Sequence, residues 1–147
     1  MSSRIRSQAL KSKVMSAHDA AALIPPGSTV GMSGFTGSGY PKAVPPQLAQ
    51  RIEDAHAAGD AFRLNLWTGA STGPELDGAL AKADGIERRL PYNSDPIARE
   101  KINSGQMDYL DMHLSQLAPA VWQGVLGPLD TAVIEVSAIN DDGSLGP

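Results

Sequence analysis

Two patterns of apolar positions alternate along the chain. Short runs rich in apolar residues, typical of buried strands, occupy residues 28–33, 62–68 and 131–139, and residues 86–90 fit a further short strand. Between them, apolar residues recur every three or four positions, which predicts helices over 41–57 and 74–83. Strands that alternate with helices favour an α/β fold with an open, mainly parallel sheet and flanking helices. The run at 131–139 is the most apolar, and we expect it to be a central strand.

Capping residues mark further helix boundaries. Ser16 and Asp19 resemble a capping box at the start of a short helix through residues 20–24. Asp95, followed by proline, predicts the start of a helix that Gly105 ends.

The last third of the chain carries two further expectations. Residues 114–122 should be helical, with an interruption near Pro119. The sequence Asp-Asp-Gly at 141–143 predicts a hairpin turn. Only four residues follow that turn, so we expect a strand pair without its second strand and a domain, residues 1–147, that is truncated at its C-terminal end.

Composition excludes several classes of protein. The 147 residues fit one domain, 41 % of them are apolar, and the net charge of −4 argues against binding to nucleic acid or to an anionic membrane. No apolar run reaches the about 18 residues of a membrane-spanning helix. The chain has no cysteine, so disulfides, thiolate metal sites and a cysteine nucleophile are excluded. We therefore expect the protein to be located in the reducing cytoplasm.

The start of the chain, residues 1–14, is basic and contains serine. It lacks the apolar core of a secretory signal. Such a segment can mimic a mitochondrial transit peptide, but a solvated first helix is the favoured interpretation.

A glycine-rich loop at residues 33–41 lies between the first predicted strand and the helix that follows. Free N–H groups at a helix start suit an anion. Gly34, Gly37 and Gly39 do not have the spacing of a dinucleotide-binding loop, and Tyr40 stands where a P-loop has lysine. The spacing leaves two alternatives, an anion-binding loop and a tight turn that needs glycine for positive φ.

A second loop of small residues, 68–74, follows the next predicted strand. Adjacent strand ends of an open α/β sheet form the crevice where ligands usually bind, so the two loops together favour a binding site. Ser71 is the hydroxyl best placed to meet a carboxylate or thioester oxygen, and turn chemistry or helix capping is the alternative. Ser94 is either an ordinary cap neighbour or a third hydroxyl at the same crevice.

Other polar residues give weaker signals. The three histidines, at positions 18, 56 and 113, are widely separated and have no acidic residue at ligand spacing, so no metal site is predicted. Glu75 and Asp77 lie near a predicted helix start and are expected to interact with its dipole. No G-x-S-x-G motif marks a serine nucleophile.

The two loops carry a family resemblance. Residues 33–42, Ser-Gly-Phe-Thr-Gly-Ser-Gly-Tyr-Pro-Lys, resemble the first signature of the acetyl-CoA hydrolase/transferase family. Residues 68–78, Thr-Gly-Ala-Ser-Thr-Gly-Pro-Glu-Leu-Asp-Gly, resemble its second signature, and residues 91–95 are similar as well. The resemblance spans nearly the whole chain, and within the family it is nearest to bacterial succinyl-CoA:acetate CoA-transferases.

This resemblance implies the N-terminal half, NagB/CoA-transferase-like in fold, of a class I CoA-transferase whose two similar halves face each other across the active site. Such enzymes move coenzyme A between an acyl-CoA, such as succinyl-CoA or acetyl-CoA, and a small carboxylate such as acetate. A glutamate attacks the thioester, an acyl–glutamyl anhydride forms, and CoA returns to give a glutamyl-CoA thioester.

The attacking glutamate belongs to the second half of the family's chain. The resemblance therefore implies no catalytic residue here and an inactive isolated fragment, and Glu135 does not match the catalytic motif. Coenzyme A is a substrate, and no covalently bound cofactor is implied. The missing C-terminal half is the implied partner, and the complete enzyme is expected to be a homo-oligomer.

The acyl side of the active site carries over to this chain. Ser71 matches a position whose hydroxyl helps to bind the carboxylate substrate, and Ser94 matches a nearby position that is usually threonine. The first loop is expected to line the same pocket with backbone N–H groups. The candidate substrate-binding residues are Ser71, Ser94, Gly34, Thr36, Gly37, Gly39 and Thr72.

Three alternatives stay open. An acetyl-CoA hydrolase of the same family differs only in water access and acceptor binding. Sugar-phosphate isomerases have related open sheets, but the chain shows no convincing acid–base pair for that reaction. A non-catalytic domain that binds a small carboxylate or CoA ester would need a linked effector domain.

Overall fold

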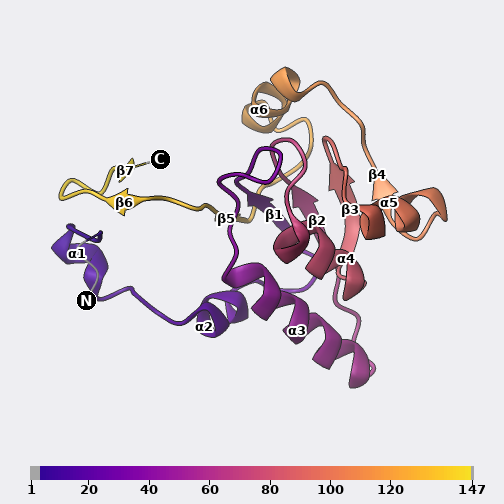
Figure 1. Ribbon diagram of the computed structural model, residues 1–147, viewed down its shortest axis with the longest axis horizontal. Coiled ribbons are helices and arrows are strands. Elements are labelled where there is room, and N and C mark those ends of the chain that lie inside the picture. The colour runs from indigo at the N-terminus through magenta and orange to yellow at the C-terminus, as the bar shows by residue number, and fades with distance from the viewer. Residues whose placement is uncertain (1–3, 147) are drawn as a thin grey trace.

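A five-stranded parallel sheet forms the centre of the molecule in a computed structural model that describes residues 4–146. The strand order is β4-β3-β2-β1-β5, and every neighbouring pair is parallel (Figure 1). The strands are β1 (Thr29–Met32), β2 (Leu64–Trp67), β3 (Ile86–Leu90), β4 (Asp108–Tyr109) and β5 (Thr131–Val133). The α/β fold with an open parallel sheet is therefore confirmed.

The main core lies between this sheet and the helices on one of its faces. These helices are α2 (Ala17–Ala22), α3 (Val44–Ala57), the π-helix η1 (Pro74–Gly78), α4 (Ala79–Lys82) and α5 (Pro96–Asn103). Leu48 and Ile52 of α3, Leu66 of β2 and Leu80 of α4 are all fully buried. Each such side chain contributes roughly 1.5–3 kcal/mol by leaving water.

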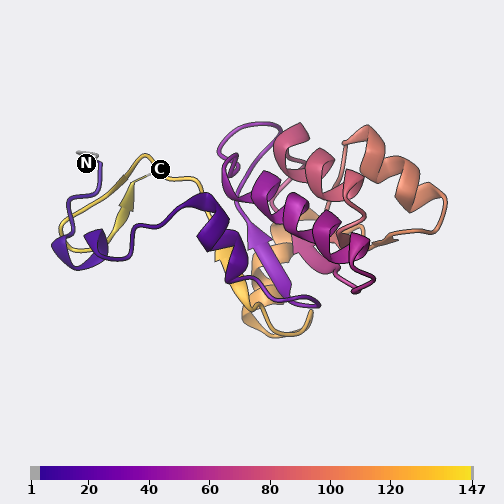
Figure 2. The same cartoon turned by 90° about the horizontal axis from the view of Figure 1, so that it is seen from below.

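Helix α6 (Leu114–Trp122) lies on the opposite face of the sheet (Figure 2). None of its residues is fully buried. The helix has the predicted bounds but continues through Pro119, so the expected interruption is absent from it. No helix within residues 4–146 is long and apolar enough to cross a membrane.

Two predicted helix starts are confirmed by their caps. The Ser16 hydroxyl accepts a hydrogen bond from the backbone N–H of Asp19 at 3.1 Å, and α2 begins directly after it, earlier than expected. The Asp95 carboxylate accepts the N–H groups of Ile97 and Ala98 at 2.9 Å each, at the start of α5. These caps satisfy N–H groups that have no partner within the helix.

Both ends of the described chain lie together, away from the central sheet (Figures 1 and 2). Ile139 exchanges backbone hydrogen bonds of 2.8 Å with Arg4 and Arg6. Within the described part of the basic start, helix is limited to α1 (Gln8–Lys11). Residues 1–3 of the predicted solvated helix lie outside the described part.

The predicted hairpin turn at 141–143 is confirmed, but the expectation of a missing second strand is wrong. Strands β6 (Ala138–Ile139) and β7 (Leu145–Gly146) pair in antiparallel fashion on either side of the turn. Two residues on each side are enough for this pairing, because the tight turn brings the chain directly back beside β6.

The prediction of one central strand over 131–139 is also wrong. Only Thr131–Val133 joins the sheet, as edge strand β5 beside β1, and residues 138–139 belong to the separate hairpin. Ile134, where the chain leaves the sheet, is 49 % exposed. An apolar run predicts that a segment is buried, but it does not predict whether the segment becomes a central or an edge strand of the sheet.

Candidate functional site

Two loops leave the sheet side by side. The first glycine loop (residues 33–40) follows β1 and the second glycine loop (residues 68–73) follows β2. Because β1 and β2 are parallel neighbours, with Gly31 paired to Trp67, both loops emerge at the same end of the sheet. This is the end at which open α/β sheets bind ligands.

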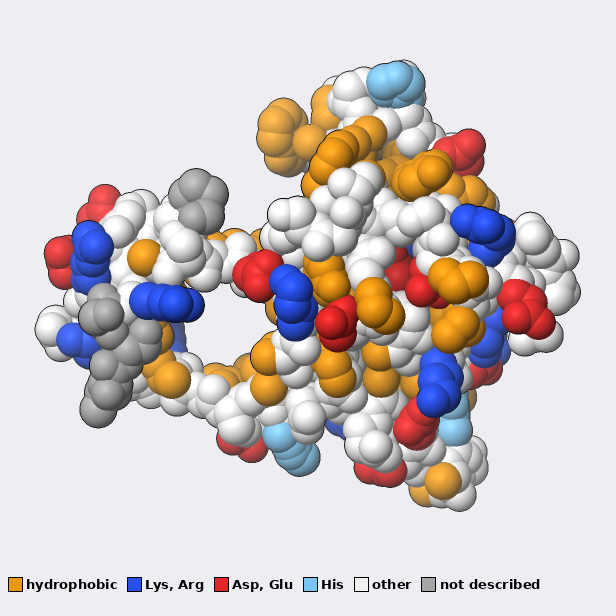
Figure 3. Space-filling view, in the orientation of Figure 1, with side chains coloured by type: hydrophobic (Ala, Val, Ile, Leu, Met, Phe, Trp, Pro, Cys, Tyr) orange, Lys and Arg blue, Asp and Glu red, His pale blue; other side chains and the backbone are white. Residues whose placement is uncertain are grey.

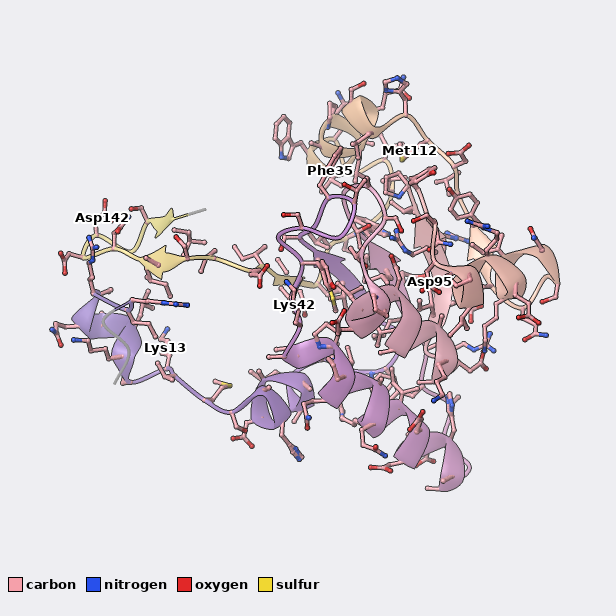
Figure 4. All side chains as sticks on the ribbon, in the orientation of Figure 1. Lys13, Phe35, Lys42, Asp95, Met112 and Asp142 are labelled. Carbon is pink, nitrogen blue, oxygen red and sulfur yellow. The ribbon has the colours of Figure 1, made fainter. Side chains whose placement is uncertain are left out.

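The first glycine loop ends in a narrow turn. Phe35 and Ser38 exchange backbone hydrogen bonds of 2.9 and 3.0 Å, and the two residues between them, Thr36 and Gly37, have φ of 47° and 86°. Positive φ at both positions is typical of a type I′ turn. The turn is exposed, and Figure 4 shows labelled Phe35 at the end of the sheet from which the loops emerge.

Ser33 closes the base of the first glycine loop. Its hydroxyl donates to the carbonyl of Gly39 at 2.6 Å and accepts the backbone N–H of Glu135 at 2.9 Å. The loop is thereby tied to the segment that follows β5.

Ser71 joins the second glycine loop to a third loop, residues 91–95, which follows β3. Its hydroxyl oxygen accepts the backbone N–H of Ser94 at 2.9 Å, so the two predicted serines do come together. Ser71 is only 1 % exposed, whereas Ser94 is exposed. Ser71 therefore lies beneath the surface and orients the third loop, and direct contact of its hydroxyl with a substrate stays a prediction.

The two glycine loops touch at Gly34. A Cβ atom at this position would lie 2.8 Å from Cγ2 of Thr72, so only glycine permits the approach. Gly34 and Thr72 therefore belong to one cluster with the two serines. Among residues 4–146, Thr36 and Gly37 make no hydrogen bond to the second loop, and they stand apart at the exposed turn. Gly39 is also exposed and lies at the base of the same loop.

A buried ion pair supports the second glycine loop, and sequence reasoning missed it. Asp77 in η1 and Arg89 in β3 are both 0 % exposed, and their carboxylate and guanidinium make two hydrogen bonds, of 2.8 and 3.0 Å. The same Asp77 carboxylate accepts the backbone N–H of Thr72 at 2.9 Å and its hydroxyl at 2.8 Å. Asp77 does lie in the first turn of a helix as expected, but its main partners are these groups. The pair thus fixes Thr72 to the sheet.

An apolar cavity of about 430 Å³ lies beside the bases of both loops. It is formed between α6 and the sheet, and its lining includes Ser33, Thr68, Trp67, Leu117 and Val121. Small ligands bind in clefts of this size that combine apolar walls with a few polar groups.

The arrangement offers hydroxyls and backbone N–H groups rather than catalytic acids or metal ligands. Within the described residues, no cluster of three histidine, aspartate or glutamate side chains could hold a metal ion. Glu135 forms an ion pair with Lys42 at 3.0 Å, and His56 contacts the carbonyl of Phe62 at 3.1 Å. The hydroxyls and backbone N–H groups are suited to hydrogen bonds with an oxygen-bearing ligand, and the two carboxylates beside the loops, Glu75 and Glu135, are paired with Tyr40 and Lys42.

Comparison with known proteins gives a consistent result. All 147 residues match a family model described as the acetyl-CoA hydrolase/transferase N-terminal domain. Succinyl-CoA:acetate CoA-transferase of Clostridium kluyveri is 44 % identical over 98 % of the chain, and propanoyl-CoA:succinate CoA transferase of Escherichia coli is 41 % identical over 88 %. Acetyl-CoA hydrolase of Saccharomyces cerevisiae is 38 % identical over 98 %. The chain spans only 26–28 % of the length of these relatives.

A solved structure shares the fold. RipA from Yersinia pestis superposes with a TM-score of 0.68 at 19 % sequence identity, over 94 % of this chain and 32 % of that one. At this identity the likeness shows the architecture alone.

Proposed function

Because the chain belongs to the acetyl-CoA hydrolase/transferase family, we propose that it is the N-terminal part of an enzyme that transfers coenzyme A from an acyl-CoA to a small carboxylate. Succinyl-CoA or acetyl-CoA is the proposed donor and acetate the proposed acceptor. The observation that supports this most is the cluster of Gly34, Ser71, Thr72 and Ser94, which joins three loops at the ligand-binding end of the sheet.

The proposed reaction uses a glutamate from outside residues 1–147. Its carboxylate attacks the thioester carbonyl and expels the CoA thiolate, which leaves an acyl–glutamyl anhydride. The thiolate then attacks the glutamyl carbonyl, releases the acyl group as a free carboxylate and forms a glutamyl-CoA thioester. The acceptor carboxylate reverses these steps and leaves as the new acyl-CoA.

The proposed role of this chain is to hold the acyl group. Each tetrahedral intermediate develops negative charge on oxygen, and preorganised N–H and O–H donors stabilise it. The exposed Ser94 is the donor a substrate would meet first, with Ser71 holding it from below. Assembly into a homo-oligomer stays a prediction from the family resemblance, and a cytoplasmic location stays a prediction from the absence of cysteine.

Hydrolysis of acetyl-CoA is the second candidate. It is favoured by the 38 % identity to a protein named acetyl-CoA hydrolase. The same glutamyl-CoA thioester would be attacked by water instead of a carboxylate, so dependence of CoA turnover on added acetate distinguishes the two.

Kinetics of Ser71→Ala in the complete enzyme test the proposal. We expect kcat/KM for acetate to fall about tenfold, because the variant leaves the Ser94 N–H without the acceptor that orients its loop. Ser115→Ala, which removes an exposed hydroxyl on α6, is the matched control and should keep wild-type kinetics. Unchanged acetate kinetics in Ser71→Ala would remove Ser71 from the acyl site.

A further inference from the structure

Tyr40, the last residue of the first glycine loop, reaches across to the segment after the second. Its side chain is 5 % exposed, and its hydroxyl donates to the carboxylate of Glu75 at 2.6 Å. Glu75 lies in η1, which begins directly after the second glycine loop. One charge-assisted hydrogen bond, of a strong type, therefore joins the segments that follow β1 and β2.

The second glycine loop is shaped to admit this tyrosine. A Cβ atom on Gly73 would lie 2.2 Å from the Tyr40 hydroxyl oxygen and 2.5 Å from the ring carbon that carries it. The φ of Gly73 is −104°, which any residue can adopt. Glycine is therefore required here by the approach of Tyr40 and not by the turn itself.

Lys42 holds the other side of the tyrosine. Its ammonium lies 4.1 Å from the centre of the Tyr40 ring and donates to the Tyr40 carbonyl at 3.0 Å. The hydrogen bond raises the pKa of Tyr40 and lowers the pKa of Glu75, so the phenol stays protonated and the carboxylate stays charged around neutral pH. The bond is thus formed between a neutral donor and an ionised acceptor.

We propose that Tyr40 and Glu75 form an interloop bridge that sets the separation of the two glycine loops and so positions the acyl-binding residues. The Gly34–Thr72 contact fixes one end of the first glycine loop, and the interloop bridge fixes the other. Both members are positioning residues, since they act through the loops and not on the reacting atoms. The inference rests on the proposed function.

Variants of the complete enzyme test the interloop bridge. Tyr40→Phe keeps the ring and removes the bond, and kcat/KM for acetate should fall about tenfold through a higher KM. Glu75→Ala should give the same fall, whereas Glu75→Gln, whose amide oxygen still accepts the bond, should stay within about threefold. The double variant Tyr40→Phe/Glu75→Ala should lose no more than either single variant, because both remove one interaction.

Ser104→Ala is the matched control. It removes an exposed hydroxyl that bonds the Lys101 carbonyl at 3.1 Å at the C-terminal end of α5, and it should keep wild-type acetate kinetics. Urea unfolding of each variant shows whether a kinetic loss follows from unfolding. Glu75 is exposed, so its two variants keep the test usable if Tyr40→Phe does not fold.

Three results would overturn the bridge: unchanged acetate kinetics in Tyr40→Phe, equal losses in the two Glu75 variants, or additive losses in the double variant. Failure of the proposed function is a different outcome, in which the wild-type enzyme itself exchanges no CoA.

Discussion

Asp77 is the side chain on which the position of the second glycine loop depends most. It accepts two hydrogen bonds from Thr72 and two from Arg89, all without contact with water. The meeting of Ser71 and Ser94 could be predicted from sequence, because both follow strands of one parallel sheet. The partner of Asp77 could not, since nothing in the local pattern shows that Arg89, on an otherwise half-exposed strand, turns its charge into the core.

Loss of the Asp77 charge should therefore lower the stability of the fold. We expect Asp77→Asn to lower the free energy of unfolding by about 3 kcal/mol, because Arg89 would stay buried without a counter-charge. The matched control is Asp108→Asn, which breaks the exposed pair of Asp108 with Arg88 at 3.4 Å and should cost less than about 1 kcal/mol. Urea unfolding compares the two, and equal losses would contradict the account.

At the scale of elements, the sequence pattern placed β1, β2, β3 and α3 close to their observed bounds, but it was wrong about the run at 131–139 and could not resolve the details of other elements. The helix predicted over 74–83 is a π-helix followed by a short α-helix, and three consecutive residues, 76–78, are buried in it. A regular α-helix turns one residue in three or four toward a core. Asp77 is buried among these residues because its carboxylate bonds Thr72 and Arg89, and sequence periodicity does not show such tertiary partners.

Three segments meet at Asp84: the turn between α4 and β3 that carries it, the residues before β2, and helix α5. The stability of their contact should depend on pH. Partial burial alone would raise the pKa of this carboxyl, but hydrogen bonds from Lys101 of α5 at 2.8 Å and Arg63 before β2 at 2.5 Å hold the pKa below its usual 3.8. A carboxylate with a lowered pKa adds stability above its usual pKa and loses it as pH falls through the lower, folded value.

Asp84→Asn removes this contribution and tolerates the local φ of 56°, since asparagine adopts left-handed backbone readily. We expect the variant to unfold at lower urea than the wild type at about pH 7, with the difference shrinking toward about pH 3. Urea midpoints across this range measure it. A difference that stays constant down to the acid end would show that Asp84 does not act through its charge.

At the scale of the whole molecule, one face of the sheet is well packed and the other is not. Trp122 at the end of α6 is 83 % exposed and Val125 is 71 % exposed, and apolar side chains gather over α6 in the space-filling view (Figure 3). Exposed apolar patches of this kind mark surfaces where proteins make further contacts. The relatives are almost four times as long as this chain, which fits a catalytic group contributed from outside it.

The location of the CoA-bearing residue tests this central claim most directly. The complete enzyme would be incubated with acyl-CoA and digested, and the peptide that carries CoA as a thioester would be identified by mass spectrometry. The account predicts a glutamyl-CoA thioester outside residues 1–147. A CoA adduct on Glu75, Glu135 or any other residue of this chain would contradict it.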